Sequence, residues 1–427
     1  MISYRPMALG RSATIRLDYS AAVTTSSHRR QPIHTVYGGA HLFKADTAAR
    51  LGATALRVLH EHAPDPDALG AVLDLEPAAA ARVHARVTEK LQREPVEDFR
   101  LDFEDGYGNR PDAEEDGHAE SAAVEVATGA ANGTLPSFVG IRIKNLGDEL
   151  RERALRTAHL FIERLLKEAN GRLPANFVVT LPKITQSGQV SILVDAFATL
   201  ETIHRLPTGT LRMELMVETP QSIFDERGAV ALPALVQEGR GRITAAHFGT
   251  YDYTASLGIT ASHQHMRHPA CDFARSVMQV ALAGTDVSLS DGATNVLPVG
   301  TDRAAIHRAW RLHYDDIRHS LTNAFYQGWD LHPAQLVTRY AAVYAFFLES
   351  LDPASERLRN FIAKAAQATL VGEVFDDAAT GQGLLNFFLR ALNCGAVKED
   401  EIEKLTGLTL AELQSGSFVK IVQGRRT

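Results

Sequence analysis

Short runs of β-branched and other apolar residues alternate along the chain with longer stretches whose apolar positions repeat at helical spacing. The expected strands are residues 33–37, 99–104, 138–143, 177–182, 211–218, 243–249, 294–299 and 328–333. Helical periodicity between them is clearest at residues 148–169, 187–205, 269–284 and 302–326. Regular alternation of this kind indicates right-handed βαβ units and a parallel sheet. Eight such units predict an α/β fold, a (β/α)8 TIM barrel, over residues 31–350.

The two ends of the chain depart from this alternation. Residues 1–30 are polar and irregular and are expected to form an N-terminal leader. Residues 351–427 show helical periodicity without a strand, which predicts a C-terminal helical appendix that acts as a lid or an oligomerisation segment. The main loop of this appendix is expected at residues 376–383.

Composition narrows the class of protein. The chain has 427 residues and is 45% hydrophobic, with a net charge of −7, which argues against nucleic acid or an anionic membrane as the main partner. The net charge does not exclude a small anionic substrate, because a local arginine or metal can make the binding site positive. With only Cys271 and Cys394, no disulfide framework is expected. Neither a run of 18 apolar residues nor a signal peptide is present, so we expect a cytoplasmic protein.

Polar residues collect where the predicted strands end, which is where a TIM barrel carries its chemistry. The segment RLDFEDGYGN (100–109) alone brings together Asp102, Glu104 and Asp105. Clustered carboxylates are costly unless something neutralises them, and a divalent cation does so most simply. One or two carboxylates completed by water and substrate suit Mg²⁺, whereas no His/Cys set has zinc-ligand spacing.

Several of these segments resemble motifs of the HpcH/HpaI aldolase and citrate lyase β-subunit family. MVETPQSI (216–223) and HFGTYDYTASLG (247–258) are similar to its Ile-Glu-Thr strand end and its Gly-x-x-Asp-Leu-x-x-x-Leu-Gly turn. The remaining matches are LDFEDG (101–106) to Asp-Leu-Glu-Asp, IRIKN (141–145) to Arg-Val-Asn, LPKI (181–184) to Pro-Lys, and DLHPAQL (330–336) to Ile-His-Pro-x-Gln. Their order and spacing agree over residues 31–345.

The resemblance implies a role for each matched position. Glu218 and Asp252 would bind Mg²⁺, or Mn²⁺ in its place. Arg142 would hold substrate oxygens, and Glu104 and Asp105 would hold water molecules around the cation. Further candidates for substrate contact at the strand ends are Tyr37, Gly38, Lys183, Gly249, Thr250 and His332.

One implied residue lies in the C-terminal appendix. GEVFD (372–376) resembles the Gly-Lys-Met-Ile-Asp segment in the lid of the acyl-CoA lyases, which implies proton transfer by Asp376, often on a neighbouring subunit. Related barrels assemble into trimers or hexamers, so a homo-oligomer is expected.

The matched positions predict a Mg²⁺-dependent carbon–carbon lyase, such as an aldolase or a citrate or malyl-CoA lyase. It would act on a small anionic 2-oxo acid, hydroxy acid or acyl-CoA through a metal-stabilised enolate. Acyl-CoA thioester hydrolysis, phosphoryl transfer and a Schiff-base aldolase using Lys183 remain alternatives. Pro220, Gln221 and Ser222 depart from the acyl-CoA lyase pattern, which leaves the involvement of CoA open.

Several histidines have structural explanations. His34 lies early in the first strand and is expected in the core, and His332 is expected to close the barrel through hydrogen bonds. The loop SHQHMRHP (262–269) contains His263, His265 and His268 at no standard ligand spacing. Because this loop would overhang the active-site face, its role remains open.

Overall fold

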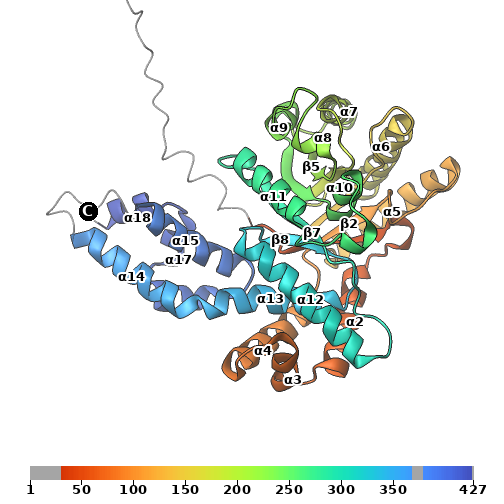
Figure 1. Cartoon of the computed structure of the whole chain (residues 1–427). Coiled ribbons are helices and arrows are strands. Elements are labelled where there is room, and N and C mark those ends of the chain that lie inside the picture. The colour runs from red at the N-terminus through yellow and green to blue at the C-terminus, as the bar shows by residue number, and fades with distance from the viewer. Residues whose placement is uncertain (1–29, 368–377, 426–427) are drawn as a thin grey trace, which may run out of the picture.

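The computed structural model describes residues 30–367 and 378–425, and its centre is a closed barrel of eight parallel strands (Figure 1). Neighbouring strands pair in chain order, and β8 closes against β1. The strands are β1 His34–Gly39, β2 Asp98–Asp102, β3 Phe138–Arg142, β4 Phe177–Leu181, β5 Arg212–Val217, β6 Ile243–Phe248, β7 Ser288–Ala293 and β8 Gln327–Asp330. The (β/α)8 prediction is confirmed.

Helices surround this barrel on its outside. Those up to β8 are η1 Ala40–Leu42, α2 Thr47–His62, α3 Pro66–Leu73, α4 Pro77–Arg93, α5 Asp112–Asn132, α6 Arg151–Glu168, α7 Gly188–His204, α8 Pro220–Ile223, α9 Leu232–Glu238, α10 Thr250–Ser256, η2 Ala261–His263, α11 Pro269–Leu282 and α12 Arg303–Thr322. Their boundaries follow local chemistry. For example, the Asp65 side chain accepts the Ala68 N–H at 2.8 Å and Pro66 begins α3, both typical of a helix start.

The seventh strand lies elsewhere than predicted. Residues 288–293 form β7, while the predicted segment 294–299 is a loop with exposed apolar side chains, such as Val299 at 51% exposure. The real strand is hard to recognise in the sequence because it is polar. Its buried Asp291 is paired with Arg275 at 3.0 Å and accepts the Ser320 hydroxyl at 2.6 Å. Partners distant in the chain therefore make this polar strand stable inside the protein.

The C-terminal appendix continues directly from the last barrel helix. Helix α13 Gln335–Glu349 is apolar on nearly all sides and buried, as expected for a helix enclosed by its neighbours. The appendix contains α14 Leu351–Gln367, α15 Ala378–Asn393, η5 Glu399–Glu401, α16 Ile402–Thr406, α17 Leu410–Gln414 and α18 Phe418–Gly424. The loop predicted at 376–383 is wrong from residue 378 onward, because α15 begins there.

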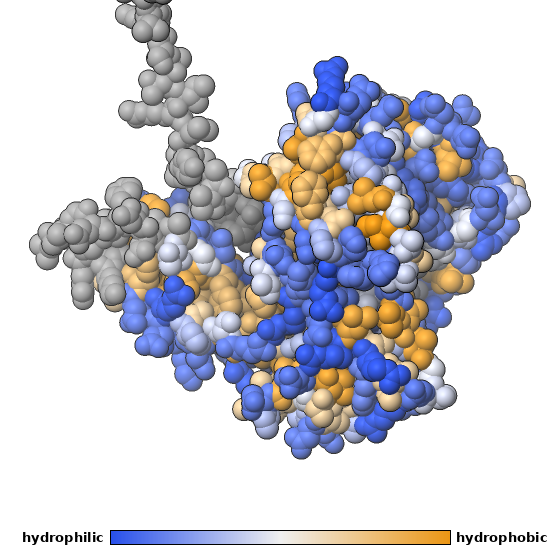
Figure 2. Space-filling model, in the orientation of Figure 1, coloured by the Kyte–Doolittle hydropathy of each residue, from blue (hydrophilic) through white to orange (hydrophobic). Residues whose placement is uncertain are grey.

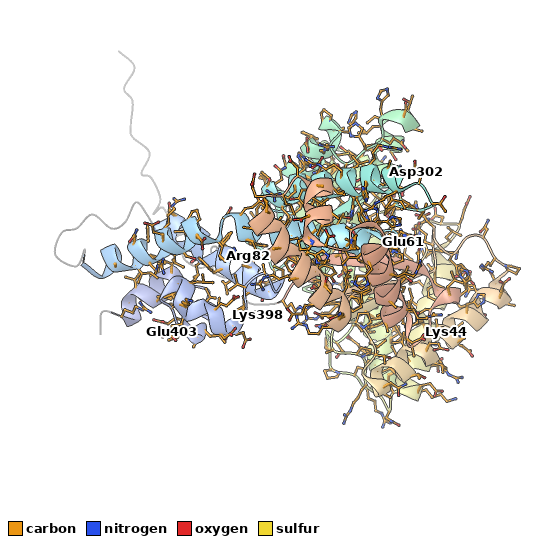
Figure 3. The ribbon with its side chains drawn as sticks, turned by 90° about the horizontal axis from the view of Figure 1, so that it is seen from below. Lys44, Glu61, Arg82, Asp302, Lys398 and Glu403 are labelled. Carbon is orange, nitrogen blue, oxygen red and sulfur yellow. The ribbon has the colours of Figure 1, made fainter. Side chains whose placement is uncertain are left out.

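The appendix extends to one side of the barrel and lies beside α4 (Figure 3). Lys398 pairs with Glu89 at 3.3 Å, and Arg86 pairs with Glu401 at 3.4 Å. Because these ion pairs are partly exposed, each contributes at most about 1 kcal/mol. Most of the attachment therefore comes from apolar packing around α13 and α15.

Hydrophilic residues dominate the visible surface, but an apolar patch covers α8 and α11 (Figure 2). Phe224 and Phe273 stack there with ring centroids 6.1 Å apart, and they are 40% and 52% exposed. An exposed aromatic pair of this kind suits a protein contact. The homo-oligomer nevertheless stays a prediction.

The two cysteines and the helices agree with the expectations from composition. Cys271 and Cys394 are free and buried. Within residues 30–367 and 378–425, the apolar helices fall short of what a membrane crossing requires.

The barrel interior holds a buried charged layer in place of the usual branched apolar side chains. Arg100 donates to Glu214 at 2.6 Å and also bonds to Asp98. His247 Nε2 lies 3.1 Å from the same Glu214 oxygen. Alternation along β2 turns Asp98, Arg100 and Asp102 inward, so this layer lies directly beneath the strand ends.

Candidate active site at the carboxyl ends of the strands

Arg142, the last residue of β3, is held in one orientation by Asp102 at the end of β2. Its Nε and Nη2 donate to the two carboxylate oxygens of Asp102 at 2.7 and 2.6 Å. The Asp102 carboxylate also accepts the backbone N–H groups of Glu104 at 3.0 Å and Gly106 at 2.7 Å. This bidentate pairing explains why Asp102 is required beside the arginine, a role that the motif match did not reveal.

The remaining Arg142 nitrogen faces the mouth of the barrel. Nη1 lies 3.1 Å from Glu104 Oε2 and 3.5 Å from Asp105 Oδ2. Burial opposes the charge of the guanidinium, but Asp102 and Glu104 raise its pKa well above the usual value. Arg142 is therefore a permanent cation with one nitrogen directed at the acidic loop.

Two aromatic rings form a platform under this guanidinium. The Arg142 Cζ lies 5.0 Å from the ring of Tyr37 and 5.8 Å from that of Trp329, and the two rings are 4.3 Å apart. The geometry fits cation–π contacts. Burial raises the pKa of Tyr37 far above its usual range, so its phenol remains protonated. Trp329, which the motif analysis missed, lies one residue before the Asp330 that opens its DLHPAQL match.

Gly38 and its neighbour Tyr37 face opposite sides of strand β1. A Cβ at this position would lie 2.8 Å from the Phe99 ring. Because side chains alternate along a strand, Gly38 faces the helix layer while Tyr37 faces the barrel interior. The need for glycine here therefore has a packing explanation.

Lys183 lies just after β4 and contacts every acidic group of the predicted cation site. Its backbone N–H donates to Glu218 Oε1 at 2.7 Å. Its Nζ lies 2.7 Å from Glu104, 2.9 Å from Asp105 and 3.7 Å from Asp252. The structure thus brings these four carboxylates, from the ends of β2 and β5 and the start of α10, around one residue.

Glu218 follows β5 and is fixed by the short helix after it. Thr219 and Ser222 form a capping box at the start of α8, with Pro220 in the first turn. The Thr219 hydroxyl also bonds to the Ile184 carbonyl, which ties the β4 loop to the β5 end. The sequence departure at residues 220–222 therefore has a structural role in holding Glu218 near Lys183.

Gly249, at the end of β6, lets the backbone approach Glu218 closely. A Cβ on Gly249 would lie 2.5 Å from the Glu218 Cβ and 2.6 Å from its Oε2. Only glycine fits at this distance. The next residue, Thr250, is buried and its hydroxyl lies 3.1 Å from the Met266 sulfur.

The carboxylates at the mouth outnumber the cations that neutralise them. Among the residues that the structure describes, the carboxylates of Asp102, Glu104, Asp105, Glu218 and Asp252 are matched by the cations of Arg142 and Lys183. Burial raises the pKa of Glu218 to about 8, and Asp252 and Glu104 reinforce the shift against Arg142 and Lys183. Burial likewise raises the pKa of Glu104 to about 6. A buried carboxyl with this shift lacks a sufficient counter-charge.

The residues present fit a hard divalent cation. Their donors are carboxylate oxygens, which Mg²⁺ and Mn²⁺ prefer, and their surplus negative charge favours a cation. Among the described residues, no group of three or more His, Cys, Asp or Glu side chains is arranged to hold a metal ion. With two carboxylate ligands, Glu218 and Asp252, most coordination positions would be left to water and substrate, as is usual for Mg²⁺.

The predicted histidines have structural partners. His34 Nδ1 lies 2.9 Å from Asp330 and its Nε2 accepts the Glu97 N–H, which confirms a core position. His332 Nδ1 accepts the Ala334 N–H at 3.1 Å, at the turn after β8. Burial lowers the pKa of His332, so it is neutral near pH 7.

In the loop with three histidines, His268 has a structural role. His268 Nδ1 accepts the Ala270 N–H at 3.1 Å and so caps α11. His265 lies beside it, with ring centroids 5.8 Å apart. The last predicted site residue, Asp376, lies outside the described residues.

Comparisons with known proteins agree with the barrel. The fold is similar to that of a citrate lyase from Burkholderia xenovorans LB400, at 19% identity and a TM-score of 0.53, covering 88% of this chain and 99% of that one. A malate synthase from Haloferax volcanii in complex with magnesium and glyoxylate shows 15% identity and a TM-score of 0.47, covering 91% and 98%. The likeness to the citrate lyase shows a shared fold, and neither likeness establishes an activity.

The sequence comparisons give the family. No curated protein matches the chain. A family model described as "Domain of unknown function (DUF6986)" matches residues 14–421, which is most of the chain. The chain, a TIM barrel with a C-terminal helical appendix, therefore belongs to this family.

Proposed function

We propose that this protein is a Mg²⁺-dependent carbon–carbon lyase that acts on a small 2-oxo or hydroxy acid. The observation that carries the proposal is the convergence of Glu104, Asp105, Glu218 and Asp252 beside Arg142 at the barrel mouth. Glu218 and Asp252 would hold the cation. When bound, Mg²⁺ would supply Lewis-acid stabilisation of the charge that develops on the substrate oxygens.

Arg142 would bind the anionic end of the substrate. Asp102 occupies its Nε and Nη2, so Nη1 is the nitrogen available to a substrate oxygen that replaces Glu104 or Asp105. The platform of Tyr37 and Trp329 keeps the guanidinium at this height in the barrel. A fixed donor placed where negative charge develops lowers the barrier, because it needs no reorganisation during the reaction.

Proton transfer would use Asp376 from a neighbouring copy. A subunit would then complete the site of its neighbour, in keeping with the proposed trimer or hexamer.

The contacts of Lys183 disfavour the Schiff-base alternative. A Schiff-base lysine must reach its neutral form, usually through a pKa lowered by burial or by nearby cations. Here burial acts in that direction, but Glu104 and Asp105 dominate and raise the pKa of Lys183. An ammonium held by carboxylates is a poor nucleophile.

The proposal is tested by incubating the purified protein with pyruvate, oxaloacetate or glyoxylate and an aldehyde or acyl-CoA partner, with and without Mg²⁺. We expect carbon–carbon bond cleavage or formation that EDTA abolishes. Free CoA without such chemistry would instead indicate thioester hydrolysis, and nucleotide dependence would indicate phosphoryl transfer. EDTA-resistant activity, together with a substrate adduct that borohydride traps on Lys183, would overturn the proposed mechanism in favour of Lys183 catalysis.

A further inference from the structure

Lys183 has an unusual backbone conformation for its place in the fold. Its φ is +50°, in the left-handed region, which costs a residue other than glycine roughly 1 kcal/mol. The other residues besides glycine with positive φ, within residues 30–367 and 378–425, all come just after helices: Asp74, Asn170, Arg205, Arg240 and Ala324. Left-handed residues are common at helix ends. Lys183 follows a strand instead, so no helix end explains its conformation.

The left-handed turn allows one residue to contact the acidic site in two ways. The backbone N–H of Lys183 holds Glu218 Oε1, while its side chain returns to the carboxylates of Glu104 and Asp105. Its Nζ also lies 3.7 Å from Asp252. Strain concentrated in this way at a cluster of charged side chains is typical of functional sites.

The ammonium of Lys183 lies where the proposed site needs positive charge. It is a compact point charge with three donors on a flexible stem, and the side chain is 27% exposed. The carboxylates that it touches include Asp252, one of the two proposed cation ligands, and both proposed water-holding residues. An ammonium and a divalent cation repel each other strongly at such short range.

From this geometry, and resting on the proposed function, we infer that Lys183 is a built-in counter-cation which Mg²⁺ displaces. The ammonium holds Glu104, Asp105 and Asp252 together until the metal arrives, and the backbone N–H keeps Glu218 in place throughout. The displaced ammonium stays tethered at the mouth, where it meets the carboxylate of the incoming substrate. Binding is therefore ordered, with the metal first and the anionic substrate second.

The test measures metal binding without any reaction. Mn²⁺ is titrated into the full-length, metal-stripped protein and followed by electron paramagnetic resonance and by calorimetry. Lys183→Met keeps the side-chain length and removes the charge, so we expect it to bind Mn²⁺ roughly tenfold more tightly than the wild type or better. Lys44→Met is the matched control: Lys44 pairs with Glu125 at 3.1 Å away from the site, and its loss should leave Mn²⁺ affinity unchanged.

A second titration tests the role of the displaced ammonium. Oxalate, a dianion that resembles the enolate of pyruvate, is added to the Mn²⁺-loaded proteins. Lys183→Met should bind oxalate about tenfold more weakly than the wild type, the reverse of its effect on Mn²⁺. Opposite changes in the two affinities are specific to a cation that moves between the acidic site and the substrate.

The outcomes separate this inference from the proposed function. If Mn²⁺ binds the wild type and Lys183→Met equally well, or the variant more weakly, the counter-cation role is overturned while the metal site stands. If neither the wild type nor the variant binds Mn²⁺, the metal-dependent function itself fails. Should Lys183→Met not fold, as judged by circular dichroism, Lys183→Gln keeps hydrogen-bond donors without charge and carries the same comparison.

Discussion

Two glutamates on the same strand show how one barrel builds a structural layer and a reactive layer. Glu214 lies within β5, and Glu218 lies one residue past its end, on the same inward-facing side. Both are buried, which disfavours the ionised carboxylate. For Glu214, Arg100 and His247 overcome burial and lower its pKa. For Glu218, burial prevails and raises the pKa to about 8.

The difference lies in the balance of charge around each glutamate. Glu214 has a guanidinium at 2.6 Å, in a layer where Asp98 and Glu214 share Arg100. Within the described residues, the direct contact of Glu218 is a backbone N–H from Lys183. The inner layer sets Arg100 and His247 against two carboxylates, although burial and the nearby Glu214 still raise the pKa of the second carboxylate, Asp98. The mouth of the barrel sets two cations against five carboxylates, and this larger surplus leaves it poised to receive a cation. The candidate site is therefore distinguished by its larger surplus of negative charge and not by burial or polarity alone.

The same substitution at both glutamates should have different consequences for stability. Glu214→Gln leaves Arg100 with one carboxylate fewer inside the barrel, and it should lower the free energy of unfolding by about 3 kcal/mol. Glu218→Gln removes a carboxylate that lacks a cation and should not lower stability in metal-free protein. Urea denaturation of both variants in EDTA measures the difference. Equal destabilisation would show that the two layers do not differ in the way described.

Loss of Arg142 should reduce turnover, whereas loss of Arg110 should not. Arg142→Ala should fold and lower turnover on the true substrate by about 10²–10³-fold, because a fixed donor to the developing charge is lost. Steady-state kinetics measure the loss. Arg110→Ala is the control and should leave turnover unchanged, because it removes the partly exposed partner of Glu114 in the segment between β2 and α5. Near-wild-type turnover of Arg142→Ala would remove it from the site.

The pH dependence of stability should reveal the unpaired Glu218. In metal-free folded protein its carboxyl keeps a proton up to about pH 8, whereas the unfolded chain releases that proton above its usual pKa of 4.5. The folded state then binds more protons between these values, so the free energy of unfolding falls as pH rises through this window. Glu218 should contribute a loss of about 2 kcal/mol between pH 6 and pH 8.

Glu218→Gln is the control for this pH dependence. The wild type and the variant are compared by urea denaturation in EDTA at both pH values, and the loss due to Glu218 should be absent from the variant. If both proteins lose the same stability between pH 6 and pH 8, another group is responsible.

A smaller effect should come from the glycine behind Glu218. Gly249→Ala places a Cβ 2.5 Å from the Glu218 Cβ, so the carboxylate must shift. We expect Mn²⁺ affinity to fall about tenfold by calorimetry, because a cation site tolerates little displacement of a ligand. Gly188→Ala, where a Cβ would meet nothing within 4 Å, should bind Mn²⁺ as the wild type does. Unchanged affinity in Gly249→Ala would argue against Glu218 as a ligand.

The parts of this protein that depend on local pattern could be read from its sequence. Apolar runs and helical spacing predicted the eight-stranded barrel and the helical appendix, because periodic burial leaves a local trace. The same reasoning missed β7, whose Asp291 is stabilised by Arg275 from a helix and by Ser320 from another. It also marked residues 378–383 as loop, although they begin α15.

For the candidate site, the sequence identified residues but not their contacts. Strand ends and motif order by themselves singled out Arg142, Lys183, Glu218 and Asp252. Only the tertiary structure showed that Asp102 fixes Arg142, that Trp329 lies beneath it, and that Lys183 joins the separate carboxylates into one cluster. The sequence determines which groups stand at each strand end, but their distances and charge balance arise only when the barrel closes, because electrostatic energy depends on separations that no local pattern encodes.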